Sequence, residues 1–158
     1  MCAVALVGCT DDATSASGQP ATGASADCTS AARSTVMEAI VRFDEGDISA
    51  VDALVAAPSR FKFVSTPVSK RVDYDRAAVT VDLRALHAAG HRFVRSASTA
   101  TDEAALQVRV LAPSLDPAGY SVAGVSVLYR DAGSVKFQVE CIDHLIVGIS
   151  WDSVATTD

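Results

Sequence analysis

TSAARSTVMEAIVRFDE (29–45) is the segment around which we build the expected architecture of this 158-residue chain. Its apolar side chains recur at helical spacing, as shown by Val36, Ile40 and Phe43, with Met37 and Val41 beside them. This spacing predicts an amphipathic helix with one apolar stripe. Thr29 or Ser30 can cap its N-terminus. We therefore expect the domain to begin with a helix that packs one face against a core.

The segments that follow predict two more helices and a set of strands. Gly46 can end the first helix, Asp47 can cap a second over 48–56, and Pro58 stops it. Asp75 can cap a third helix over 76–89, with Gly90 as its C-terminal residue, although Val79–Leu83 also alternates like a strand. Alternation and turn residues predict strands at 60–65, 91–98, 104–111, 120–129, 134–140 and 145–151. Helices first and antiparallel strands later predict an α+β domain.

The order of several short motifs resembles the NTF2-like (SnoaL-like, cystatin-like α+β) superfamily over about residues 30–152. Phe43-Asp44-Glu45-Gly46-Asp47, a second helix and the strand Phe61-Lys62-Phe63 resemble its opening. Arg60-Phe61-Lys62-Phe63, Leu86–His91 and Cys141 ahead of Ile146–Trp151 resemble exported actinobacterial members without an assigned function. The resemblance implies a cone, in which three N-terminal helices pack on a curved, mostly antiparallel sheet around an apolar pocket.

The same resemblance leaves the activity open, because isomerases, cyclases, dehydratases and binding modules share this fold. The side chains that we expect in or near the pocket are Phe43, Phe61, Phe63, His91, Tyr129 and Trp151. The usual aromatic pair after Phe61 is reduced to Phe63-Val64, so we do not expect a ligand contact shared with the family there.

The N-terminus predicts export. Leu6-Val7-Gly8-Cys9 has the form at which bacterial prolipoproteins are lipidated and cleaved, although the apolar segment is short and no Lys or Arg precedes it. We interpret 1–8 as a remnant of a signal peptide, 9–27 as a lipidated Cys9 with a disordered linker, 28–152 as the domain and 153–158 as a tail. The expected location is the extracytoplasmic face of the cell membrane, reached through a lipid anchor.

The remaining cysteines and the charge balance restrict the setting further. Cys28 and Cys141 are an even pair, which in an exported domain predicts a disulfide, with two buried free thiols as the alternative. The net charge of −6 gives no basic surface for a nucleic-acid partner. No apolar run approaches the length of a membrane-spanning helix. The oligomeric state stays open, with a homodimer as one option.

The polar side chains form no recognisable catalytic or metal-binding motif. His87 and His91 are four residues apart, but the zinc-protease motif needs a Glu where Ala88 stands. The carboxylates expected near the pocket rim are Asp73, Asp75 and Asp82, and the phenols are those of Tyr74, Tyr120 and Tyr129. We assign no cofactor and expect a binding lipoprotein for a small apolar ligand or an envelope partner. The alternative is a pocket isomerase or dehydratase with an Asp or His general base.

Overall fold

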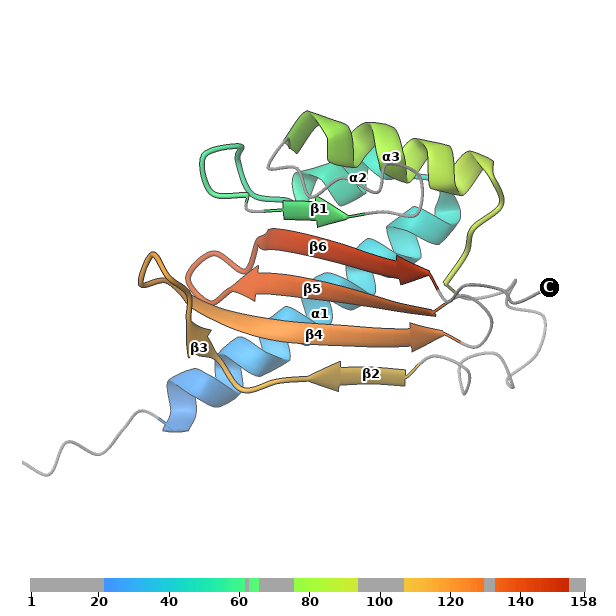
Figure 1. Cartoon of the computed structure of the whole chain (residues 1–158). Coiled ribbons are helices and arrows are strands. Elements are labelled where there is room, and N and C mark those ends of the chain that lie inside the picture. Colours follow the sequence, from blue (N-terminus) through green and yellow to red (C-terminus); the bar gives the residue numbers. More distant parts are fainter. Residues whose placement is uncertain (1–21, 62, 66–75, 94–106, 130–132, 154–158) are drawn as a thin grey trace, which may run out of the picture.

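The computed structural model describes residues 22–61, 63–65, 76–93, 107–129 and 133–153. Three helices and six strands occur in these ranges, and Figure 1 shows how they are arranged. The helices are α1 (Thr22–Glu45), α2 (Ile48–Ala53) and α3 (Arg76–Ala88). The strands are β1 (Phe63–Ser65), β2 (Gln107–Val110), β3 (Ser114–Leu115), β4 (Ser121–Tyr129), β5 (Gly133–Glu140) and β6 (Ile146–Ser153). The expected α+β class, with helices packed on a mostly antiparallel sheet, is confirmed.

The sheet has the strand order β1-β6-β5-β4-β2, and β3 pairs with the start of β4. β1 lies parallel to β6, while the other pairs are antiparallel. The register between β5 and β6 shifts at Gln138/Val139, which is where an extra residue bends a strand. β4, β5 and β6 therefore form a long meander, and the parallel strand β1 closes one edge (Figure 1).

Helix α1 lies across one face of this sheet, and α2 and α3 lie toward its β1 edge (Figure 1). The buried side chains of α1 follow the helical period from its first turns to its end, and they are Cys28, Ala32, Val36, Ala39, Ile40 and Phe43. They meet inward side chains of β4, β5 and β6 such as Val125, Phe137 and Ile149 in one core. The predicted stripe of Val36, Ile40 and Phe43 is confirmed.

Glycines end both long helices in the same way. Gly46 has φ +82°, its N–H donates to Phe43 O at 2.9 Å, and the Asp47 N–H donates to Arg42 O at 2.9 Å. Gly90 has φ +87°, with the equivalent bonds to His87 O and Leu86 O. This double bond pattern is the Schellman motif, which favours glycine because of the positive φ. The predicted ends of both helices are confirmed, and the strand alternative for 79–83 is wrong.

Other predicted boundaries need correction. α1 begins at Thr22, so it includes residues that we expected in the linker, and the Thr29 hydroxyl donates to Ala26 O at 2.8 Å inside the helix instead of capping it. α2 ends at Ala53, because Val55 leaves the helix and bridges to Ile146 at the sheet edge. β6 continues through Ser153, where we expected the tail to begin.

Three predicted strands are shorter than expected in the described ranges. Arg60 and Phe61 form a turn on Ala57 O, so the strand at 60–65 is reduced to β1. His91–Phe93 is not a strand, since His91 completes the end of α3; residues 94–98 lie outside the described part. The segment that we expected as a turn between Pro113 and Gly119 contains the short strand β3. No helix within the described ranges is long and apolar enough to cross a membrane.

Candidate functional site

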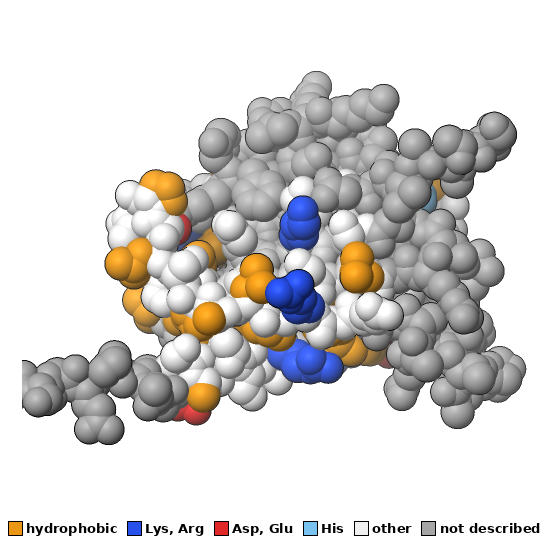
Figure 2. All heavy atoms as spheres, turned by 60° about the horizontal axis from the view of Figure 1, so that its bottom comes forward, with side chains coloured by type: hydrophobic (Ala, Val, Ile, Leu, Met, Phe, Trp, Pro, Cys, Tyr) orange, Lys and Arg blue, Asp and Glu red, His pale blue; other side chains and the backbone are white. Residues whose placement is uncertain are grey.

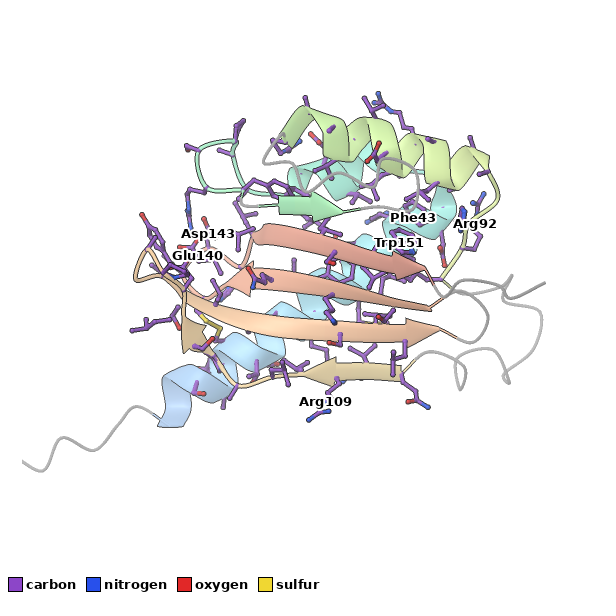
Figure 3. The ribbon with its side chains drawn as sticks, viewed as in Figure 1. Phe43, Arg92, Arg109, Glu140, Asp143 and Trp151 are labelled. Atoms are coloured by element: carbon purple, nitrogen blue, oxygen red, sulfur yellow. A yellow bond between two sulfur atoms is a disulfide. The ribbon has the colours of Figure 1, made fainter. Side chains whose placement is uncertain are left out.

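The predicted pocket residues Phe43 and Trp151 meet at one end of the domain, where α1 and β6 both end (Figure 3). The ring of Phe43 is the centre of a cluster, with ring centroids 5.5 Å from Phe93, 5.7 Å from Trp151 and 5.7 Å from His87. Phe93 and Trp151 are 5.0 Å apart. We call Phe43, His87, Phe93 and Trp151 the aromatic cluster.

Two backbone features place these rings. Asp44, the residue after Phe43, accepts a hydrogen bond at 2.8 Å from the backbone N–H of Phe93, which fixes the chain after α3 against the end of α1. Gly46 leaves room for His87, since a Cβ at position 46 would lie 2.9 Å from His87 Cε1. The motif Phe-Asp-Glu-Gly-Asp therefore builds the aromatic cluster. We did not anticipate the role of Asp44, although its place in the quoted motif could have suggested one.

The cavity beside this cluster is small. Its volume is about 10 Å³, and its lining consists of Ala39, Ile40, Phe43, Val51, Leu83, Phe93, Phe137, Ile149 and Trp151. Such a volume holds about one water molecule at most, whereas small-molecule sites commonly measure several hundred Å³. All nine lining residues are apolar, so no acid or base of the described ranges lines it. As described, the pocket is filled by its own side chains.

Of the other predicted pocket residues, the structure describes the side chains of Phe61 and His91 but not those of Phe63 and Tyr129. Phe61 is buried but does not line this cavity. His91 is also absent from the lining, and its ring lies 6.2 Å from that of Trp151. Phe63 is in β1 and Tyr129 ends β4, but their side chains lie outside the described part, as do Cys9, Asp73, Tyr74 and Asp75. Asp82 is buried on α3 and is not among the residues that line the cavity.

The other end of the sheet carries the predicted disulfide. Cys28 of α1 is bonded to Cys141, which directly follows β5, with a Cα–Cα distance of 5.1 Å and a sequence separation of 113. Ser121, at the start of β4, supports this link because its carbonyl accepts the Cys141 N–H at 2.9 Å. The disulfide prediction is confirmed, and the alternative of two free thiols is wrong.

A polar cleft lies near the disulfide, on the sheet face opposite α1. Its volume is about 110 Å³, and it is lined by Ser59, Arg60, Asp116, Ala118, Tyr120, Val122, Glu140 and Val147. Glu140 faces away from the core because it pairs with Val122 in the register of β4 and β5. Glu140 and Asp143 lie together at this end, far from Phe43 and Trp151 (Figure 3).

Arg60 is the centre of this cleft. Its guanidinium forms ion pairs with Glu140 and, at 2.7 Å, with Asp143, and it lies 5.5 Å from the centre of the Tyr120 ring. The Glu140 side chain is only 2% exposed, and within the described ranges its Oε1 has no hydrogen-bond partner. A buried carboxylate with an unused oxygen costs free energy unless a donor reaches it. A polar group that enters the cleft would lie beside this ion pair.

A third polar group has a structural role. Arg76, at the start of α3, donates to Asp52 O at 2.7 Å and to Ala56 O at 3.0 Å, and it pairs with the Asp52 carboxylate. Thr80 also donates to Asp52 at 2.5 Å. The hydrogen bond from Arg76 to the Asp52 carboxylate, together with that from Thr80, holds the pKa of Asp52 below its usual value. The group joins α2 to α3, and no metal-binding group of three or more His, Cys, Asp or Glu occurs in the described ranges.

Comparison with known proteins adds little to this geometry. No protein-family model and no curated protein matches the chain. Among solved structures, the chain is similar to a crystal structure described as a "putative ketosteroid isomerase" from Kribbella flavida. The two share 14% identity, with 82% of this chain and 84% of that chain covered and a TM-score of 0.41. At this level the match supports no functional argument, so the site rests on the chain's own residues.

Proposed function

We propose that this chain is an exported lipoprotein, anchored by lipid on Cys9, whose NTF2-like domain is a binding module of the cell envelope. The observation that carries the proposal is the disulfide between Cys28 and Cys141. Disulfides persist in secreted and surface proteins and are rare in the cytosol, where thiols are kept reduced. The disulfide also accounts for both cysteines of the domain, which leaves Cys2 and Cys9. Of these two, Cys9 follows Leu6-Val7-Gly8 and is the thiol that we propose is acylated.

The geometry favours binding at the polar cleft over binding of an apolar ligand in the aromatic cluster. The cavity of the cluster has room for about one water molecule, while the cleft is about tenfold larger and contains the unused Oε1 of Glu140. The cleft is still smaller than sites for drug-sized molecules. It fits one polar group of a ligand or one polar side chain of a partner protein, placed beside the Arg60–Glu140 ion pair.

The NTF2-like assignment rests on motif order and on the position of each motif in the structure. The Phe43–Asp47 motif ends α1 and starts α2, β1 follows, and the strand after Cys141 is β6. This is the element order that the resemblance implies. The enzyme alternative gains no support from the cavity, because a general base would have to face it.

The test of export is the chemical state of three cysteines in the full chain expressed in an actinobacterial host. Mass spectrometry of the N-terminal peptide should find a diacylglyceryl group on Cys9, and Cys9→Ser should release the protein from the membrane fraction. Thiol labelling without reductant should leave Cys28 and Cys141 unmodified. Unacylated protein in the cytosol with both thiols labelled would refute the proposal.

Binding is tested on the same preparation. Ligands and proteins that copurify with the wild type should be lost from the double variant Arg60→Met/Glu140→Leu, which removes both members of the ion pair in the cleft. The matched control is Arg84→Met, which removes an exposed charge from α3. Equal copurification with all three proteins would show that the cleft is not the binding site.

A further inference from the structure

Three large side chains are exposed at the disulfide end of the domain. Leu115 is 74% exposed, Ile142 is 76% exposed and Tyr120 is 43% exposed. Leu115 pairs with Ser121 in the sheet, and the Ser121 carbonyl accepts the N–H of Cys141. Tyr120 directly precedes Ser121 and Ile142 directly follows Cys141, so the three exposed residues are close to one another along the paired backbone. We call Leu115, Tyr120 and Ile142 the apolar tip. Figure 2 shows orange side chains gathered at this end of the molecule.

The apolar tip lies where the chain enters the domain. Ile142 follows Cys141, which is bonded to Cys28, and Cys28 is six residues after the start of α1 at Thr22. The first turns of α1, β3 and the connection between β5 and β6 occupy the same end of the molecule (Figure 1). The disulfide therefore fixes the tip beside the point from which the N-terminal segment departs.

The N-terminal segment limits how far this end can be from a membrane. Twelve residues separate Cys9 from Thr22, and even a fully extended chain of that length spans only about 45 Å. A tether from this end also presents the tip, and not the opposite aromatic cluster, to the surface that holds Cys9. Tethering raises the local concentration of the tip at that surface, so weak apolar contacts become effective.

From these observations we infer that the apolar tip docks into the interfacial layer of the lipid bilayer to which Cys9 is anchored. This inference rests on the proposed lipid anchor. Leu115 and Ile142 have the aliphatic side chains that enter the acyl boundary, and a tyrosine places its ring at the headgroup level. The charged side chains described nearby include Asp27, Asp116, Asp143 and Arg60, and Arg60 is paired. The attraction is therefore apolar and not electrostatic.

Quenching by brominated lipids tests this orientation. Full-length lipidated protein carrying Ile142→Trp is reconstituted in vesicles of phosphatidylcholine and phosphatidylglycerol, with or without brominated acyl chains. The introduced indole should shift to shorter wavelength and lose most of its emission in brominated vesicles. Val81→Trp is the matched control, because Val81 is 62% exposed but lies on α3. The native Trp151 is 4% exposed and provides a constant background in both proteins.

A second substitution and a change of salt complete the experiment. Leu115→Glu in the Ile142→Trp protein should abolish the quenching, and Val81→Glu in the same protein should leave it unchanged. High salt should not reverse the quenching, and a salt-sensitive signal would refute apolar docking. An acylated protein whose indole at 142 is no more quenched than that at 81 overturns the inference alone. A blue shift without quenching by bromine would show that a second copy or a partner protein covers the tip.

Absence of the acyl group on Cys9 would overturn the anchor and the inference together. The mass of the N-terminal peptide, measured on the same vesicles, therefore distinguishes the two failures.

Discussion

The two ends of this domain are held together by different means. At one end, Phe43 packs against Phe93, Trp151 and His87, and the nearby cavity is almost filled. At the other, the same helix is attached through Cys28–Cys141, and Arg60 neutralises the buried Glu140. Only the second end exposes Leu115 and Ile142. A covalent link thus stabilises an end that does not bury all of its apolar surface, which leaves that surface available for contacts outside the chain.

The largest effect should come from the aromatic cluster. Phe43→Ala removes a side chain that is 1% exposed, and we expect a loss of about 3–5 kcal/mol in the free energy of unfolding, measured with urea. Val41→Ala, two residues earlier and 48% exposed, should change it by less than about 0.5 kcal/mol. Similar values for the two variants would mean that the cluster does not stabilise its end of the domain.

The disulfide end should respond to Cys28→Ser/Cys141→Ser with a loss of about 2–5 kcal/mol, because a long loop in the unfolded chain is no longer closed. The wild type in reductant is the control and should unfold at the same urea concentration as the double variant. The variant should keep its far-ultraviolet circular dichroism at low urea. A stability equal to that of the oxidised wild type would contradict the contrast between the two ends.

Removing Arg60 alone should cost more stability than removing Arg60 and Glu140 together. Arg60→Met leaves the Glu140 carboxylate buried without its cation, and we expect a loss of about 2 kcal/mol, below the range for fully buried pairs because Arg60 is 33% exposed. Arg60→Met/Glu140→Leu should recover most of that loss, since both charges are gone. A double variant less stable than Arg60→Met would show that Glu140 is stabilised by groups other than Arg60.

The smallest effect concerns the pH dependence of stability, and it involves Asp52, which belongs to neither end of the domain. The pKa of Asp52 is lower in the folded protein than its ordinary value of 3.8, so its contribution is complete above that value and is lost as the pH falls through the folded pKa. Asp52 is 37% exposed, and Asp52→Asn should therefore cost less than about 1 kcal/mol at neutral pH. The difference from wild type in urea unfolding should shrink as the pH falls below 3.8. A difference that grows on acidification would exclude this origin.

Patterns in the sequence predicted the features of the fold that depend on contacts between residues close in sequence. The stripe of α1, the glycine ends at 46 and 90 and the meander of β4, β5 and β6 all follow from residues close in sequence. The pairing of Cys28 with Cys141 could also be predicted, because the proposed removal of Cys2 and acylation of Cys9 leave no other partner.

Distant contacts account for what could not be predicted. The residues from Thr22 to Asp27 have no apolar stripe, so their sequence did not predict that α1 extends over them. The parallel pairing of β1 with β6 and the burial of Glu140 against Arg60 likewise join segments separated by about eighty residues. The polar cleft was missed for this reason, since none of its charged residues forms a local motif.

The position of the disulfide also determines how the domain responds to mechanical load. A pull applied at the N-terminus reaches Cys28 within two turns of α1 and passes through the sulfur atoms into β5. Strands β4 and β6 hold β5 on both sides, so the strain is shared across the meander in shear. The rest of α1, including Phe43, then carries little tension, and the helix cannot be peeled from the sheet turn by turn.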